Sequence, residues 1–366
     1  MRGRAFMAGL LVVVTPAAAG AAPAGRAAPW KVVKLSGLRG MDSLYDIVAA
    51  GPNAAWAVGE RRADSNPRAL AYHWNGRSWR RTPLPAGLGP SPRLAAAPGA
   101  GAWMLADSCA GSKGGSCAKS TILRWTGRAW RPVFRSGLLL GELAVAGRRD
   151  VWAFGTGRDR RKALHFDGRH WHRAKVPGEV VQAAAVSRTD IWAVAGGGEE
   201  DLGPAPRTVL HFDGRRWTTV RGVLPKKSGR SSRLSGISVI RGRVVLAGAF
   251  HPGWEEEGFL VRRTSKGWTR EDLPPTHFGG WIPGAPVPDG RGGLWMRVWS
   301  YDDEDIRIGV AHRTGGGAWS IRQIYDGSGE TRSVGRLEAL APAGGVLWLV
   351  GSIDRPEDAF IARRAT

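Results

Sequence analysis

The sequence predicts an all-β protein, a seven-bladed β-propeller of four-stranded blades. Two short phrases recur along the chain at intervals of about 40 to 50 residues, the period typical of propeller blades. The first phrase is a strand that contains Trp, and the second is a hairpin signal that ends in Trp. The last repeat lacks this second Trp, and a lone Trp strand near the N-terminus supplies it. These observations predict a closed ring.

Residues 1–29 are expected to be a secretion signal, removed on export, and a short linker. Arg2 and Arg4 precede an apolar run at 5–14, and small residues that suit cleavage follow it. The run is shorter than the roughly 20 apolar residues of a membrane-spanning helix, and no later segment reaches that length. We therefore expect a secreted, extracellular protein without a transmembrane anchor, with one β-propeller domain at 30–366.

Both phrases have a structural meaning. The first reads D-[VI]-W-A-x-G, as at 150–155, and the second reads H-[FW]-[DN]-G-x-x-W, as at 165–171. A tight hairpin turn needs a residue of positive φ, so pairs such as Asp167-Gly168 are expected to turn strand 3 into strand 4. Clusters of Gly, Pro and Asn before each Trp strand are expected to turn strand 1 into strand 2. Each repeat therefore contains four strands.

The segment at 30–36 is expected to close the ring. A strand-4 Trp occurs six times within the repeats, whereas the last repeat stops after its third strand. Trp30 opens a strand that stands alone, so we assign it to the blade that begins near Leu337. This pairing would remove two open sheet edges.

The two phrases resemble those of secreted bacterial repeat propellers grouped with the kelch, galactose-oxidase-like and Asp-box propellers. The resemblance covers 30–364 and implies the propeller fold, but no particular activity, because unrelated chemistries share this scaffold. The Asp-box of sialidases places one residue between its Asp and Gly. Asp167-Gly168 does not, so this turn only approximates that family's.

Most aromatic residues and the two cysteines are expected to be structural. Six Trp belong to strand 2, seven to strand 4 and two to strand 3, where they would fill the gaps between neighbouring sheets. A disulfide between Cys109 and Cys117 would close a short loop in an oxidising compartment, and no His at ligand spacing supports zinc instead. Four histidines share one strand-3 position in separate blades and cannot converge on one metal: His73, His165, His211 and His312.

Charge is distributed unevenly along the chain. The net charge is +22, which favours anionic partners, and Arg and Lys concentrate on strands 3 and 4, where they also discourage edge pairing. The loops between strands 2 and 3 are basic in the first three blades, as at Arg61, Arg62 and 158–162. They are acidic later, at 199–201, 255–257, 302–305 and 354–358. Either these loops are simply solvated, or the acidic half binds a cation or a basic partner.

Metals and cofactors receive no assignment. The segment at 303–309 fails as an EF-hand loop because Arg307 stands where an oxygen ligand is needed. Calcium stays open, without a motif to support it.

The first candidate site is an aromatic patch beside the acidic loops. Three Trp lie outside the packing positions, and aromatic rings near carboxylates suit sugar stacking or a cation held over a ring. The candidate ligand-binding residues are Trp254, Trp281, Trp299, Tyr301, His251, Glu255 and Asp302.

The second candidate is a polar ring on the inner strands, ten residues before each strand-2 Trp. Such groups are either solvated, or they orient a ligand or serve as acid and base. The ring consists of Asp46, Arg93, Glu142 and Gln182, with Ser235 and Glu338 at the equivalent places.

No catalytic motif appears: the sequence has no G-x-S-x-G elbow, Walker loop or H-E-x-x-H. The leading hypothesis is a non-catalytic recognition or scaffold propeller that binds a glycan, an anionic wall polymer or a protein partner on its loop face. The alternative is a glycan-cleaving hydrolase or lyase that uses Asp46, Glu142 and Glu338. We expect a monomer, and nucleic acid is not the expected partner.

Overall fold

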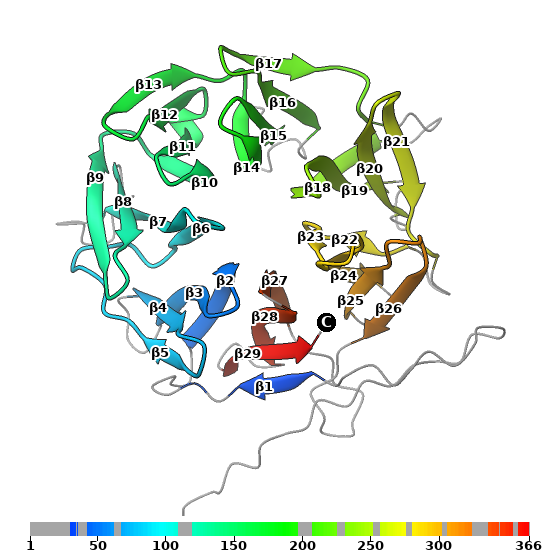
Figure 1. The fold of residues 1–366 in the computed structure, drawn as a ribbon, viewed down its shortest axis with the longest axis horizontal. Coiled ribbons are helices and arrows are strands. Elements are labelled where there is room, and N and C mark those ends of the chain that lie inside the picture. The colour runs from blue at the N-terminus through cyan, green and yellow to red at the C-terminus, as the bar shows by residue number, and fades with distance from the viewer. Residues whose placement is uncertain are drawn as a thin grey trace, which may run out of the picture.

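The strands form seven four-stranded antiparallel blades in a ring around a central channel, which confirms the predicted fold class (Figure 1). The computed structural model describes residues 30–33, 35, 42–61, 67–108, 119–196, 207–224, 231–251, 257–275, 280–301, 306–323, 336–343, 345–353 and 358–365. None of these residues forms a helix with the length and apolar character of a membrane span.

Each blade runs from an inner strand at the channel to an outer strand at the rim (Figure 1). The strands of blades 1 and 2 are β2 (Asp42–Gly51), β3 (Ala54–Arg61), β4 (Arg68–Trp74), β5 (Trp79–Arg81), β6 (Arg93–Ala97), β7 (Gly101–Ser108), β8 (Lys119–Trp125) and β9 (Trp130–Ser136). Those of blades 3 and 4 are β10 (Leu140–Gly147), β11 (Asp150–Gly155), β12 (Lys162–Phe166), β13 (Trp171–Lys175), β14 (Glu179–Ser187), β15 (Asp190–Gly196), β16 (Thr208–Phe212) and β17 (Trp217–Val220).

The remaining blades follow the same order, except that the inner strand of blade 6 is broken into two short pieces, both paired with β24. Blades 5 and 6 contain β18 (Ser231–Ile240), β19 (Arg243–His251), β20 (Glu257–Thr264), β21 (Gly267–Asp272), β22 (Ile282–Pro283), β23 (Val287–Pro288), β24 (Leu294–Tyr301), β25 (Ile306–Arg313) and β26 (Trp319–Gln323). Blade 7 contains β27 (Arg336–Ala343), β28 (Val346–Ile353), β29 (Asp358–Ala365) and β1 (Lys31–Val33).

The N-terminal strand closes the ring, as predicted. β1 pairs antiparallel with β29, with Lys31 opposite Arg363 and Val33 opposite Ile361, and it is shorter than the predicted 30–36. Trp30 is 1% exposed and belongs to a core cluster with Phe360 and Leu347. The chain ends are therefore joined by hydrogen bonds and by apolar burial, and β1 covers part of the edge that β29 would otherwise leave open.

The turns between strands 3 and 4 are longer than predicted. Phe166 pairs with Trp171, so four residues form the loop instead of the two of a tight primed turn. Asp167 Oδ1 accepts the N–H groups of Arg169 and His170, each at 2.8 Å, and Gly168 has a φ of 100°. The need for positive φ was predicted correctly. The loop length was wrong because the Asp side chain organises a wider turn.

The recurring Trp residues pack between blades, as predicted. Trp152 of blade 3 meets Trp217 of blade 4 edge-on, with ring centroids 5.4 Å apart and planes at 83°. Trp348 of blade 7 meets Trp79 of blade 1 in the same way, at 5.2 Å and 90°. All four side chains are buried. Each contact therefore fastens one sheet to its neighbour, and the last contact joins the two ends of the ring.

Candidate functional site

The aromatic patch predicted from the sequence falls largely outside the region that the structure describes. Trp254, Glu255 and Asp302 lie outside the described residues, while His251 and Tyr301 are the last residues of β19 and β24. The acidic loop residues at 199–201, 255–256, 302–305 and 354–357, and both cysteines, also lie outside them.

Trp281 is a core residue and is inaccessible to a surface ligand. It is 7% exposed and packs with Leu260, Leu273 and Met296 between blades 5 and 6. It departed from the repeated Trp spacing because the inner strand of blade 6 is broken, so Trp281 just before β22 fills core space in an irregular blade. The structure thus corrects its assignment to the ligand site.

Trp299 has a different environment. It lies on β24, is partly buried, and lines the central channel. The guanidinium carbon of Arg297 lies over its ring, 5.1 Å from the centroid. The structure therefore separates Trp281 from Trp299 and leaves Trp299 at a cavity wall.

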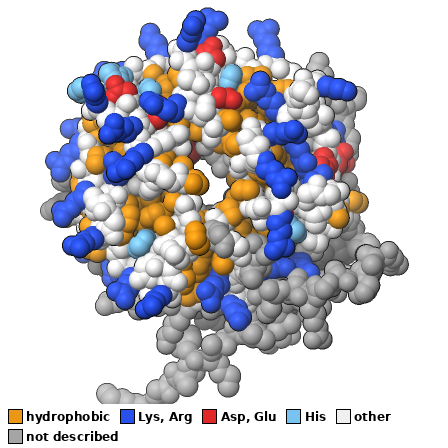
Figure 2. Space-filling model, viewed as in Figure 1, with side chains coloured by type: hydrophobic (Ala, Val, Ile, Leu, Met, Phe, Trp, Pro, Cys, Tyr) orange, Lys and Arg blue, Asp and Glu red, His pale blue; other side chains and the backbone are white. Residues whose placement is uncertain are grey.

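The central channel contains a cavity of about 1170 Å³, whose opening is visible at the centre of the ring in Figure 2. This volume is somewhat above the range typical of small-molecule sites, about 300–1,000 Å³. Residues from all seven blades contribute to its wall, and the polar and aromatic ones are Tyr45, Asp46, Arg93, Glu142, Glu179, Gln182, Arg233, Ser235, Ser238, Arg297 and Trp299.

Three members of the predicted polar ring accept the same kind of hydrogen bond from the next blade. Asp46 Oδ2 accepts the Leu94 N–H of the next blade at 2.8 Å, and Gln182 Oε1 accepts the Ile237 N–H at 2.9 Å. Glu142 stands at the same position in blade 3 and accepts a backbone hydrogen bond from the Ala183 N–H of blade 4. The shared requirement at this position is therefore an acceptor that ties one inner strand to the next. Sequence reasoning missed this role because the partner belongs to another repeat.

Ser235 and Glu338 do not share this position. In the pairing of strands 1 and 2, Gly236 and Ala339 stand where Asp46 stands in blade 1, and Ser235 and Glu338 lie one residue earlier, in the bulge. Blades 5 and 7 lack the second register shift that blade 1 has near its turn between these strands. In blades 5 and 7, counting ten residues back from the strand-2 Trp position therefore selects the residue just before the equivalent one. Arg93 pairs with Leu105 and is in register.

Burial changes the acidity of the ring carboxyl groups. It raises the pKa of Asp46 to about 6 and the pKa of Glu142 to about 8, and the charge of Asp46 adds to the second effect. Arg93 opposes the increase at both groups. At neutral pH Glu142 is largely protonated, so among the described residues of the cavity wall the guanidinium groups of Arg93, Arg233 and Arg297 outnumber the ionised carboxylates.

Other charged residues near the loop face hold the blades together. Glu179 accepts hydrogen bonds from Thr156 Oγ1 and from the Gly157 N–H, which joins blade 4 to blade 3. Arg61, one of the predicted basic loop residues, makes a two-point ion pair with Asp42 at 3.0 and 2.8 Å, and the Asp42 side chain is fully buried. Among the described residues, no group of three or more His, Cys, Asp or Glu side chains is placed to hold a metal ion.

Comparisons with known proteins identify the fold and no family. No family model and no curated protein matches the sequence. Among solved structures, an ulvan lyase of polysaccharide lyase family 25, bound to -[GlcA(1-4)Rha3S]-, has a TM-score of 0.51 and 11% identity over 91% of this chain and 96% of its own. A GH74 xyloglucanase from Xanthomonas campestris has a TM-score of 0.55 and 18% identity, over 91% of this chain and 55% of its own.

A third solved structure is the S511A mutant of puromycin hydrolase complexed with PGG. It has a TM-score of 0.52 and 13% identity, over 87% of this chain and 52% of its own. At these identities the likeness concerns the propeller fold alone, because propellers with unrelated chemistries share this shape.

Proposed function

We propose that this protein is a secreted, non-catalytic recognition module that binds an acidic polysaccharide in its central channel. The observation that carries the proposal is the channel wall, where Arg93, Arg233 and Arg297 surround one cavity and Trp299 lies beside them. Guanidinium groups match carboxylate and sulfate groups with paired hydrogen bonds, and an aromatic face offers a surface for a sugar ring.

The charge of the whole molecule supports an anionic partner. The net charge is +22, and Lys and Arg side chains are spread around the face shown in Figure 2, where Asp and Glu are few. A field of this sign raises the local concentration of a polyanion and speeds its association. The ulvan lyase of similar fold is bound to a glycan that contains glucuronate, which is consistent with a propeller that accommodates such a chain.

The hydrogen bonds of the ring support binding without catalysis. The carboxyl groups of Asp46 and Glu142 each accept a hydrogen bond from a backbone N–H of the next blade, and the side-chain amide of Gln182 accepts an equivalent hydrogen bond. An amide cannot act as a general acid or base at neutral pH. The presence of Gln182 at this position therefore shows that the hydrogen bond between blades does not need an ionisable side chain.

One observation favours a second candidate, a glycan-cleaving hydrolase or lyase. Glu142 holds a proton near neutral pH and feels the charge of Asp46, and a protonated carboxyl beside a more acidic one is the pattern of an acid and base pair. Appearance of new reducing ends at catalytic protein concentrations, lost in Glu142→Gln, would establish this activity.

The binding proposal is tested by titrating protein that starts at residue 30 with polygalacturonate and with a neutral glucan, at low and high salt. We expect binding to the acidic polymer only, weakened at least tenfold in Arg93→Gln/Arg297→Gln. The matched control is Arg131→Gln, which removes a positive charge from the exposed outer strand β9. An equal loss in the control variant, or absence of binding in the unmodified protein, would overturn the proposal.

A further inference from the structure

One structural unit recurs in three blades. In blade 3 the Asp150 carboxylate bonds His165 Nε2 at 3.1 Å, and the imidazole stacks on Trp152 with centroids 4.3 Å apart. Blade 6 repeats the unit at Asp289, His312 and Trp295, and the Asp289 side chain is 5% exposed. Blade 4 has it at Asp190 and His211, 2.8 Å apart. The repetition makes the unit part of the scaffold, and differences among its copies become informative.

The copy in blade 3 is closed by its neighbour. Arg188, on the turn between β14 and β15 of blade 4, donates its Nε–H to Asp150 Oδ2 at 3.0 Å. The side chain of Asp150 is consequently 3% exposed. Both carboxylate oxygens of Asp150 are occupied within the protein.

The copy in blade 4 is open. Asp190 Oδ1 accepts both His211 Nε2 and the Trp192 Nε1–H, the latter at 2.6 Å. Asp190 Oδ2 accepts no hydrogen bond from any residue in the described part of the chain, and the side chain is 34% exposed. One carboxylate oxygen of this unit therefore faces solvent.

The turn of blade 5 explains the opening. Arg241 stands four residues before Val245, as Arg188 stands four before Trp192, but its φ of 51° lies in the left-handed region. Its guanidinium reaches toward blade 6, where a Cβ at Gly292 would lie 2.4 Å from Arg241 Cζ. Among the residues that the structure describes, no arginine of blade 5 takes the place that Arg188 has in blade 4, and a pocket of about 480 Å³ remains between blades 4 and 5.

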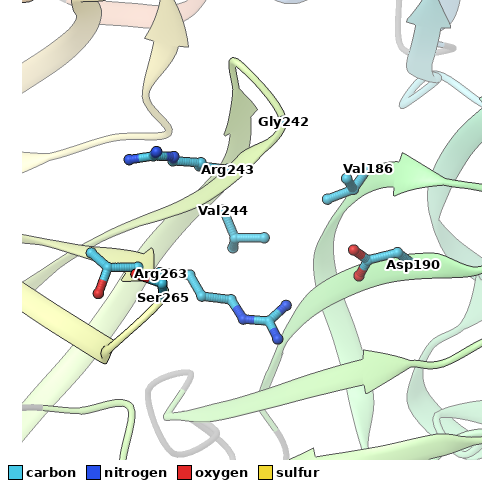
Figure 3. Close-up of a pocket in the computed structure, with 8 residues that line it drawn as sticks. Val186, Asp190, Gly242, Arg243, Val244, Arg263 and Ser265 are labelled. Atoms are coloured by element: carbon cyan, nitrogen blue, oxygen red, sulfur yellow. The ribbon is translucent and has the colours of Figure 1, made fainter.

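Opposite charges face each other across this pocket. Figure 3 shows Asp190 on one wall and the Arg263 guanidinium extending from the other, with Val186 above Asp190, Val244 above the Arg263 side chain and Arg243 pointing away. Arg263 lies over the Trp192 ring, 4.6 Å from its centroid, and pairs with no carboxylate in the described residues. The pocket thus offers one acceptor, one cationic donor and an apolar floor.

We propose that this pocket, on the face formed by the turns between strands 1 and 2, binds one sugar unit that carries a carboxylate or sulfate. The anionic group would meet Arg263, ring hydroxyls would donate to Asp190 Oδ2, and the apolar side of the ring would lie on Val186 and Val244. The ligand class rests on the proposed function. The site is separate from the channel cavity, because no residue lines both.

The test follows the Trp192 indole N–H signal by NMR, because this group is bonded to Asp190 beside the pocket. The probe is a glucuronate-containing disaccharide, with a neutral disaccharide and a free amino acid as comparisons. Asp190→Asn keeps the Oδ1 acceptor for His211 and Trp192 and replaces only the open oxygen by a donor. We expect the acidic disaccharide to shift the signal, and at least tenfold weaker affinity in Asp190→Asn and in Arg263→Gln.

The matched control is Asp150→Asn, which changes the closed copy and should leave the response intact. Arg93→Gln/Arg297→Gln, which disables the channel, should leave it intact as well. A silent Trp192 signal while the channel still binds polygalacturonate would overturn this site and not the proposed function. A response to the amino acid alone would overturn the ligand class, and a response to the acidic disaccharide in a protein whose channel binds nothing would support this site while the proposed function fails.

Discussion

Replacing Glu142 by Gln is expected to stabilise the propeller at neutral and alkaline pH. Glu142 stands in the channel wall and accepts the Ala183 N–H of the next blade. Gln182 makes the equivalent bond to Ile237 at 2.9 Å, so an amide satisfies the same geometry one blade further on. The substitution therefore preserves the inter-blade hydrogen bond and removes only the ionisation.

The sign and size of the effect follow from the pKa of Glu142, which burial raises from 4.5 to about 8. Below pH 4.5 the carboxyl is protonated in both states and has no effect. As pH rises, the unfolded chain ionises first, so stability falls until about pH 8 and then levels off. A pKa shift of this size corresponds to a loss of roughly 5 kcal/mol in the free energy of unfolding. Because water in the channel screens the charge, we expect Glu142→Gln to recover about 1 to 3 kcal/mol of it.

The assay is urea unfolding followed by Trp fluorescence at pH 4, 6, 7.4 and 8.5. Wild type and Glu142→Gln should coincide at pH 4 and separate steadily above it, with the variant more stable. The reciprocal variant Gln182→Glu places a carboxyl at the same position of blade 4 and should lose stability over the same pH range. If Glu142→Gln had the same pH dependence as wild type, or were less stable at pH 8.5, the assignment of a buried, protonated carboxyl would be refuted.

Three further predictions test the packing and one buried ion pair, each by thermal or urea unfolding. Trp30→Ala removes a side chain that is 1% exposed at the ring closure, and should lower stability by about 3 to 5 kcal/mol; a change below 1 kcal/mol would argue against this closure. Arg61→Leu removes the two-point ion pair of Arg61 with the fully buried Asp42 carboxylate and should also lose about 3 to 5 kcal/mol, recovered in part when Asp42→Leu is added. Trp281→Ala should destabilise by about 3 to 5 kcal/mol, and Trp299→Ala by clearly less, because only the former lies in the closed core between blades 5 and 6; equal losses would contradict this distinction.

The fold was readable from the sequence because the residues that join the blades are large and recur. A Trp that fills the gap to the next sheet, as Trp152 does against Trp217, recurs at a regular spacing in the sequence. The ring closure was readable for the same reason, since Trp30 is the missing member of that series. Blade 6 was harder, because its inner strand is split into β22 and β23 and its Trp281 does not follow the repeat.

The sites were readable only in part, because their geometry depends on contacts between repeats. The spacing placed Asp46, Glu142 and Gln182 on the inner strands, yet their bonds to the next blade involve backbone groups that carry no sequence signal. A bulge moves Glu338 by one residue from the position that simple counting gave. Arg233 and Glu179 were missed because counting selected a different position on their inner strands, and Arg297 was missed because it lies on β24, the second strand of blade 6.

Repetition at one position has a consequence for how function arises in a ring. Asp150 and Asp190 occupy the same place in neighbouring blades and bond the same type of His, yet one is sealed and the other is open. The difference lies in the following blade, where Arg188 turns back to the carboxylate and Arg241 turns away. A single turn can therefore expose or cover a polar unit that already exists in the preceding blade, while the unit itself keeps the buried contacts that stabilise the sheet.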